Sequence, residues 1–228
     1  MTVISNLSVI KQALEKKSVF IFDFDGVIVD SNDIKGSMFA KLYEHYGKEI
    51  ENKVRNYHSL NPGVSRFDKM SYFHKNFLNK ELTLEDLNLI CDRFSDLVME
   101  KVVVSKEIQG AKKFLKNSFY DGKLCFINSA TPTNELRSIV KKRSIDLFFS
   151  GVYGSPSSKE NNLKEILKKT STDIEDCIFF GDALSDFNAA KSVSMDFIGI
   201  GQSIASSLNK MEGSYFALDN FRAYNNGA

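Results

Sequence analysis

Short runs of apolar residues recur along the chain without polar alternation, and each is followed by small or polar residues. This pattern is typical of strands that are buried on both faces of a parallel sheet. Between the runs, apolar residues recur at helical spacing. The repeated order of strand, turn and helix predicts an α/β fold, a Rossmann-like parallel sheet with right-handed crossovers. The predicted strands are residues 19–24, 124–128, 151–153, 177–180 and 196–200.

The segment of residues 31–105 differs from the rest of the chain. Helical periodicity covers residues 34–46, 67–78 and 84–98. The valines at 102–104 fit either the end of a helix or an extended linker. We therefore expect an inserted α-helical cap at residues 31–105 on an α/β core made of residues 1–30 and 106–228. Such an insertion can serve as a lid, and ligands of these folds bind beyond the carboxyl ends of the strands.

Composition and charge narrow the function classes. The net charge of +1 over 228 residues supplies no global field for a nucleic acid or an anionic membrane, so we expect neither as a partner. The cysteines Cys91, Cys125 and Cys177 are odd in number and far apart, which favours a reducing compartment. We expect no signal peptide, no membrane helix and a cytoplasmic location. The oligomeric state stays open, although a monomer fits this size and charge.

Two carboxylates end the first predicted strand. Asp23 follows four consecutive apolar residues, Asp25 comes two positions later, and Gly26 ends the run. Because residues i and i+2 of a strand point to the same side, the two carboxylates are expected to lie close together. Such a pair is electrostatically costly unless a cation neutralises it. The alternative is a surface turn, in which Asp and Gly are common, but the apolar approach to Asp23 disfavours it.

The carboxylates Asp182 and Asp186 follow another predicted strand. Taken alone, Asp182 or Ser185 could simply cap the helix that comes next. Beside Asp23 and Asp25, however, they would complete an all-oxygen site, and such a donor set favours Mg²⁺ over zinc. The sequence therefore predicts Mg²⁺ as the cofactor, with Asp23, Asp25, Asp182 and Asp186 as candidate ligands.

Two further residues could bind an anion near these strand ends. Ser129 follows a predicted strand, where its hydroxyl and the next backbone N–H can face an anion at a helix start. Lys159 begins a predicted helix. Each has an ordinary alternative, since Ser129 could be a helix N-cap and Lys159 a solvated lysine at a helix end.

The order Asp-x-Asp, Ser, Lys, Gly-Asp-x-x-x-Asp resembles that of the haloacid dehalogenase superfamily of Mg²⁺-dependent phosphotransferases. DFDGVIVDS matches its first motif, FINSA its second, Lys159 its third and FFGDALSD its fourth, over residues 18–200. The chain is most similar to the branch of phosphoglycolate phosphatases and β-phosphoglucomutases, whose members carry a helical cap. Glu160 stands where that branch often has proline, so Lys164 and Lys168 remain alternatives for the third motif.

The resemblance implies a phosphatase that hydrolyses a small phosphorylated metabolite through an aspartyl-phosphate. Asp23 would be the nucleophile, and Asp25 would protonate the leaving group and then activate water. Mg²⁺ would be held by Asp23, the backbone carbonyl of Asp25 and Asp182, while Asp186 ligates directly or orients the ligands. The groups implied to hold the transferring phosphoryl oxygens are Ser129, the N–H of Ala130 and Lys159.

The segment GVSR at residues 63–66 is similar to a segment of β-phosphoglucomutases in which the arginine meets a substrate phosphate. Arg66 is therefore a candidate substrate-binding residue, with an exposed arginine at a helix start as the alternative. The same segment keeps a sugar-phosphate mutase as the second candidate function. A non-catalytic module that binds a phosphorylated ligand is less favoured, because every acidic position that the chemistry needs is present. Asp25 favours phosphoryl transfer over carbon–halogen cleavage, since the dehalogenases lack this second acid.

Overall fold

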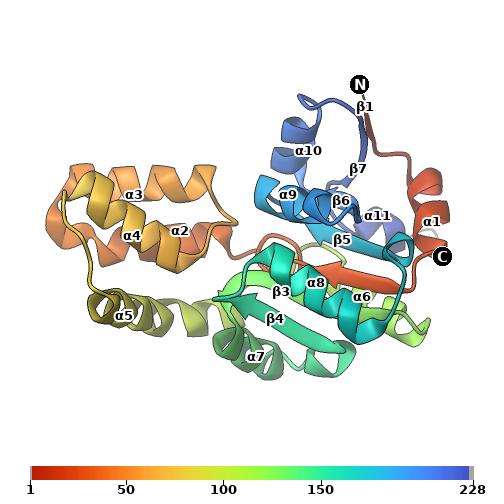
Figure 1. The fold of residues 1–228 in the computed structure, drawn as a ribbon, viewed down its shortest axis with the longest axis horizontal. Coiled ribbons are helices and arrows are strands. Elements are labelled where there is room, and N and C mark those ends of the chain that lie inside the picture. Colours follow the sequence, from red (N-terminus) through yellow and green to blue (C-terminus); the bar gives the residue numbers. More distant parts are fainter. Residues whose placement is uncertain (1, 226–228) are drawn as a thin grey trace.

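The computed structural model describes residues 2–225, and Figure 1 shows their sheet with helices on both sides. The strands run in the order β1-β7-β6-β5-β2-β3-β4, and all neighbouring pairs are parallel. The parallel α/β sheet that the apolar runs predict is confirmed. The strands are β1 (Thr2–Ile4), β2 (Val19–Phe22), β3 (Leu124–Pro132), β4 (Gly151–Ser155), β5 (Cys177–Gly181), β6 (Asp196–Ile200) and β7 (Ser214–Leu218).

Helices connect the strands and cover both faces of the sheet (Figure 1). This arrangement is the one that right-handed crossovers between parallel strands produce. Short 3₁₀ turns occur at η1 (Glu44–Tyr46), η2 (Asp146–Phe148) and η3 (Ile174–Asp176). The helices around the sheet are α1 (Leu7–Glu15), α6 (Ala111–Tyr120), α7 (Thr133–Lys142), α8 (Lys159–Thr170), α9 (Leu184–Ser192), α10 (Gln202–Leu208) and α11 (Arg222–Asn225).

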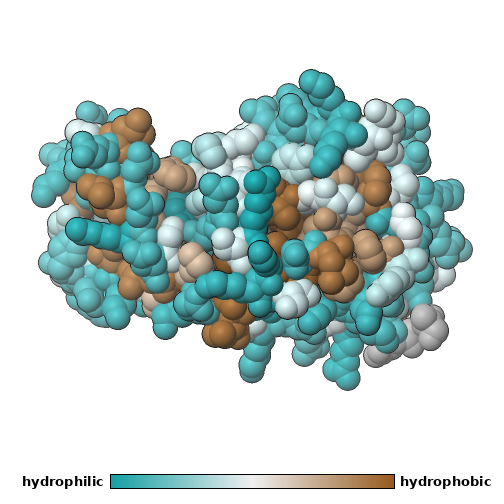
Figure 2. All heavy atoms as spheres, turned by 90° about the horizontal axis from the view of Figure 1, so that it is seen from below, coloured by the Kyte–Doolittle hydropathy of each residue, from teal (hydrophilic) through white to brown (hydrophobic). Residues whose placement is uncertain are grey.

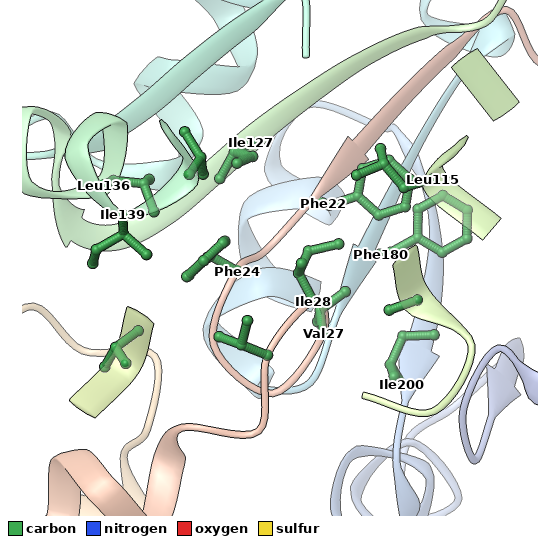
Figure 3. Packing of buried hydrophobic residues seen from close by; sticks show 14 of the residues in the cluster. Phe22, Phe24, Val27, Ile28, Leu115, Ile127, Leu136, Ile139, Phe180 and Ile200 are labelled. Atoms are coloured by element: carbon green, nitrogen blue, oxygen red, sulfur yellow. The ribbon is translucent and has the colours of Figure 1, made fainter. Parts of the chain in front are cut away.

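The core consists of two apolar clusters, one on each face of the sheet. Successive strand residues point to opposite faces, so a fully apolar strand feeds both clusters. Phe20 and Phe22 of β2 pack on one face with residues of α6 and α7, and Phe22 stacks on Phe180 of β5 at 4.8 Å between ring centroids (Figure 3). Val19 and Ile21 of the same strand pack on the other face with residues of α8 and α9. The central strand β2 is therefore held rigidly from both sides.

Four helices between β2 and α6 form a separate lobe beside the sheet (Figure 1). They pack around aromatic residues that continue the apolar cluster of one sheet face, in which Phe39 stacks on Phe94 at 3.9 Å and meets Phe73 edge-on at 6.0 Å between ring centroids. Figure 2 shows this lobe joined to the larger part, with a mostly hydrophilic surface on the face in view. These helices, called the inserted helices below, are α2 (Asn32–Leu42), α3 (Lys48–Leu60), α4 (Arg66–Phe77) and α5 (Leu84–Val103).

Some elements are not visible in the hydrophobic pattern. The valines at 102–104 end α5 and do not form a linker. Strand β1 is only three residues long, and helix α3 carries mostly polar side chains, so neither forms an apolar run that stands out in the sequence. Strand β7 joins the sheet between β1 and β6. Within residues 2–225, no helix combines the length and the apolar character that crossing a membrane requires.

Candidate active site

The loop after β2 carries two aspartates to the carboxyl edge of the sheet. The backbone N–H of Asp23 donates to the carbonyl oxygen of Phe180 at 2.9 Å, so the pairing of β2 with β5 continues to this residue. Gly26 then turns the chain with a φ of 77°, and a Cβ at this position would lie 2.0 Å from Oδ2 of Asp182. Only glycine permits this close approach. Asp23 and Asp25 are both buried.

Asp23, Asp182 and Asp186 form an acidic cluster. One carboxylate oxygen of each residue lies within 4.8 Å of the other two. Asp182 follows β5 and Asp186 lies in the first turn of α9, and β5 is the neighbour of β2 in the sheet. Burial and the charges of Asp23 and Asp186 raise the pKa of Asp182 well above its usual range. Burial also raises the pKa of Asp186 to about 7, although Lys159 opposes this shift.

These donors fit a hard divalent cation. The cluster offers carboxylate oxygens only, the ligand type that Mg²⁺ prefers, and the raised pKa values show how costly the charges are without a counter-ion. The side chain of Asp25 lies outside this cluster, so Asp25 can contribute its backbone carbonyl alone. Asp182 accepts the side-chain amide of Asn32 at 2.7 Å and does not cap α9. The cap role falls to Asp186, whose Oδ2 accepts the N–H of Ala183 at 3.1 Å.

Lys159 lies inside the acidic cluster. Its side chain is 8% exposed, and its ammonium group donates to Oδ2 of Asp23 at 2.7 Å and to Oδ1 of Asp186. Burial opposes its charge, but the two aspartates prevail and hold the pKa of Lys159 above its usual range. The alternative of a solvated lysine is therefore wrong. Of the other lysines considered for this role, Lys164 pairs with Glu160 on the surface and Lys168 is exposed.

The carboxylate of Asp25 is held by a separate set of partners. Lys35 of α2 donates to its Oδ2 at 2.5 Å, Thr131 donates to the same oxygen at 3.0 Å, and Ser31 donates to Oδ1 at 2.5 Å. Lys35 also donates to the hydroxyl of Thr131 at 2.7 Å. Burial by itself would raise the pKa of Asp25, but Lys35 and the two hydroxyls hold it below its usual range. Asp25 is thus a buried, ion-paired carboxylate.

Ser129 and Ala130 lie on β3, the other neighbour of β2, and both line the same cleft as Asp23. The hydroxyl of Ser129 accepts the N–H of Thr131 at 3.2 Å, and it does not cap α7, whose N-cap is Pro132. Next to it, the side-chain amide of Asn128 donates to the carbonyl oxygen of Lys159 at 2.9 Å. This bond fixes the start of α8 against β3 and thereby positions the lysine.

Arg66, the first residue of α4, is 5% exposed, which excludes the alternative of an exposed arginine. Its guanidinium forms two hydrogen bonds with the carboxylate of Glu135 on α7, at 2.8 and 2.7 Å. It also donates to Ser95 at 2.5 Å and lies 4.8 Å from the ring centroid of Phe94. Arg66 lines the cleft, but its charge is already paired across the junction between the inserted helices and the sheet.

The cleft between the sheet edge and the inserted helices is narrow, with a volume of about 30 Å³. Both sides supply charged groups to it. Asp23, Asp25 and Asp182 come from the sheet edge, and Lys35 and Lys69 come from the inserted helices. Sequence reasoning missed several of these residues. Ser31 ends the first motif, and Asn32, Lys35, Thr131 and Lys69 stand within four positions of a recognised segment, whereas no local signal marks His58 or Glu135.

Comparisons with known proteins agree with this architecture. The family model of haloacid dehalogenase-like hydrolases matches residues 20–200. No curated protein matches the sequence. Among solved structures, the chain is similar to a β-phosphoglucomutase from Clostridium difficile, with 19% identity, a TM-score of 0.74, and coverage of 91% of this chain and 92% of that one.

Two further structures have the same fold. A predicted phosphoglycolate phosphatase from Haemophilus somnus shares 18% identity at a TM-score of 0.69, with coverage of 92% of this chain and 97% of that one. A predicted phosphatase from Clostridium acetobutylicum shares 19% identity at a TM-score of 0.67, with coverage of 88% and 93%. The family match spans most of the sequence, from β2 to β6. The chain belongs to the haloacid dehalogenase-like hydrolase family.

Proposed function

We propose that this protein is a Mg²⁺-dependent phosphatase that hydrolyses a small phosphorylated metabolite through an aspartyl-phosphate. The observation that carries the proposal is the convergence of Asp23, Asp182, Asp186 and Lys159 at one end of the sheet. The site combines buried carboxylates, a lysine that is paired with two of them, and hydroxyl and backbone donors on β3. This combination suits a phosphoryl group. The phosphatases among its structural neighbours are consistent with this activity.

Asp23, Asp182 and the backbone carbonyl of Asp25 would hold the ion, and Asp186 would either ligate it or orient the other carboxylates. The bound Mg²⁺ would offset part of the negative charge of the carboxylates and so ease the approach of a dianionic phosphate ester. Lys159 stays in contact with Asp23 and Asp186, where its charge also faces the incoming phosphoryl oxygens. Ser129 and the N–H of Ala130 would donate to the same oxygens.

The reaction has two steps. In the first, an oxygen of Asp23 forms a bond to phosphorus as the bond from phosphorus to the leaving oxygen breaks, and the leaving oxygen receives a proton from Asp25. Asp25 draws this proton from Lys35, with which it is paired. In the second step, water attacks phosphorus and breaks its bond to Asp23, while Asp25 takes the proton from water and returns it to Lys35. The lowered pKa of Asp25 suits the second step, in which it acts as a base.

A β-phosphoglucomutase-like sugar-phosphate mutase is the second candidate. The position of Arg66 in the cleft and the similarity to a β-phosphoglucomutase favour it. Arg66 is paired with Glu135, however, so a substrate phosphate would have to displace a buried carboxylate. This pairing favours the phosphatase over the mutase. A non-catalytic module that binds a phosphorylated ligand is the least favoured of the three. Tight binding of beryllofluoride only in the presence of Mg²⁺ would argue against it.

We further propose that residues 31–105 act as a cap over a catalytic core of residues 1–30 and 106–228. The cleft between them measures about 30 Å³, so a small metabolite enters only when the cap moves away from the core. A small metabolite, and neither a nucleic acid nor a membrane, is the partner that we propose. The three cysteines are buried and unpaired, which supports a reducing compartment such as the cytoplasm.

The test is a panel of sugar and carboxylate phosphates assayed with Mg²⁺ and then with EDTA. We expect free phosphate from at least one ester, loss of activity on chelation, and loss of activity in Asp23→Asn. Asp92→Asn is the matched control, since Asp92 is exposed on α5, away from the cleft. Undiminished hydrolysis in EDTA and in Asp23→Asn would contradict the mechanism. Isomerised sugar phosphate in place of free phosphate would identify the mutase.

A further inference from the structure

Lys69 is a buried lysine that lines the cleft opposite the sheet edge. It lies on α4, one turn after Arg66, and is 1% exposed. Its ammonium group donates to the carbonyl oxygen of Pro62 and to Nδ1 of His58, both at 3.0 Å, and the ring of Phe39 lies 5.4 Å from it. Nε2 of His58 lies 3.1 Å from the carbonyl oxygen of Asn32 and can only donate there, which makes Nδ1 the acceptor. Lys69 therefore has two neutral partners and a third proton to donate.

Lys69 differs in this respect from the other cations of the cleft. Lys35 is paired with Asp25, Lys159 with Asp23 and Asp186, and Arg66 with Glu135. Lys69 has no carboxylate partner among residues 2–225. A buried charge without a counter-ion is expensive, and a merely structural role at this position could be filled by a neutral side chain.

The charged groups around Lys69 also indicate that it lacks an anionic partner. Burial, together with the charges of Lys35 and Lys159, lowers the pKa of Lys69 to about 7, and the charges of Asp25 and Asp182 oppose this shift. His58 is the titratable group in direct contact, and burial together with the charge of Lys69 lowers its pKa to about 3, so it is neutral near pH 7. These interactions show that Lys69 responds to the charges of the sheet edge. An anion placed between them and Lys69 would supply the missing partner.

We propose that Lys69 binds a second anionic group of the substrate while the phosphoryl group lies at Asp23. The substrate is then a small phosphate ester that carries a carboxylate or a second phosphate. This inference rests on the proposed function, since it assigns the substrate class of the same site. Lys69 is suited to this role because Arg66, the residue expected to meet a substrate phosphate, is already neutralised by Glu135. A charge-assisted hydrogen bond of this kind contributes about ten- to hundredfold in affinity.

The test compares esters that differ only in the distal group. We would measure kcat/KM with Mg²⁺ for 2-phosphoglycolate, which ends in a carboxylate, and for 2-hydroxyethyl phosphate, which ends in a hydroxyl. A third ester, ethylene glycol bisphosphate, separates a second phosphate from a carboxylate. The variants are Lys69→Met, which keeps the length and removes the charge, and Lys69→Arg, which restores a cation. Lys75→Met is the matched control, since Lys75 is exposed on the same helix.

We expect the wild type to prefer an ester with a second anion by at least about tenfold. Lys69→Met removes this preference by raising KM for the anionic ester alone, and Lys69→Arg restores part of it. The ester with the larger loss identifies the natural distal group. Equal losses on charged and uncharged esters would indicate a structural role and overturn the proposal. A wild type without preference, or a preference that persists in Lys69→Met, would overturn it as well.

Binding separates this inference from the proposed function. Calorimetry with the Asp23→Asn variant measures the affinity for the same three esters without turnover. A tighter affinity for a second anion that vanishes when Lys69→Met is added supports the inference, even if no ester is hydrolysed. Equal affinities for all three esters would refute it, even if the wild type hydrolyses them.

Discussion

The ion pair between Arg66 and Glu135 joins the inserted helices to the sheet, and its removal should be strongly destabilising. The two side chains are 4% and 6% exposed, and their two hydrogen bonds measure 2.8 and 2.7 Å. Ser95 bonds to both partners, at 2.5 and 2.7 Å. Both charges are buried, so deletion of one leaves the other without a partner, and such deletions lower the free energy of unfolding by about 3–5 kcal/mol. Replacement of both by apolar side chains of similar volume leaves no unpaired charge and should lower it by less than about 2 kcal/mol.

A double-mutant cycle tests this reasoning. Urea unfolding followed by far-ultraviolet circular dichroism gives the free energy of unfolding of the wild type, Arg66→Met, Glu135→Leu and the double variant. We expect each single variant to lose about 3–5 kcal/mol and the double variant to recover most of it, a coupling of at least about 2 kcal/mol. Lys142→Met is the control for a surface pair, since Lys142 bonds with the exposed Glu100, and it should change stability by less than about 1 kcal/mol. Single losses below about 1 kcal/mol, or strictly additive losses in the double variant, would refute the assignment.

Three further predictions concern the same cleft. Gly63→Ala places a Cβ 1.9 Å from Oγ of Ser185, so we expect KM for the substrate to rise about tenfold. Addition of Ser185→Gly should restore KM, and a normal KM in Gly63→Ala would contradict the close contact between these two residues. The pKa of His58 falls from 6.5 to about 3 on folding, so the unfolded state binds more protons between these values and stability drops as pH falls through that range, by up to about 1.4 kcal/mol per pH unit. Urea unfolding at several pH values should show a shallower slope in His58→Gln, and equal slopes would exclude this cause. Asp182→Asn should stabilise the metal-free protein above the unfolded-state pKa of about 3.9, because folding raises the pKa of Asp182 and its charge then opposes folding. The same variant should lose the stabilisation of about 2.7 kcal/mol that Mg²⁺ at a hundredfold excess over Kd gives the wild type, and an unchanged response to Mg²⁺ would contradict the ligand role.

The residues at the strand ends could be predicted because topology decides where they meet. A parallel sheet brings the carboxyl ends of its strands to one edge, and β2 lies between β3 and β5. Asp23 and Asp182 stand directly beyond β2 and β5, whereas Ser129 lies within β3, two residues after Ile127, the last partner of β2. The apolar runs predict that these residues share one edge of the sheet, and the strand order, which the runs do not indicate, makes them neighbours. Their catalytic roles stay predictions until the variants are assayed.

The contacts across the cleft could not be predicted in the same way. The sequence indicates that the inserted helices exist, but not which face of each one turns toward the sheet. Lys35 and Lys69 are two of 30 basic residues, and each sits in a helix whose polar positions look alike in sequence. The partner of Arg66 on α7 is 69 positions away, and nothing near Glu135 marks it as a buried anion. These contacts depend on how the two lobes pack together, and local sequence patterns do not indicate that packing.

The distribution of charge explains why this site needs both lobes. The sheet edge alone presents Asp23, Asp25, Asp182 and Asp186 against the single cation of Lys159, an environment that repels an anionic ester. One divalent ion lessens this excess without reversing it, since the carboxylates still outnumber the positive charges around the nucleophile. The inserted helices add cations on the opposite wall, with Lys35 neutralising Asp25 and Lys69 left for an incoming anion. The lobe that we propose as a cap therefore also adds the positive charge that an anionic substrate would need, and changes in that lobe should alter affinity and specificity together.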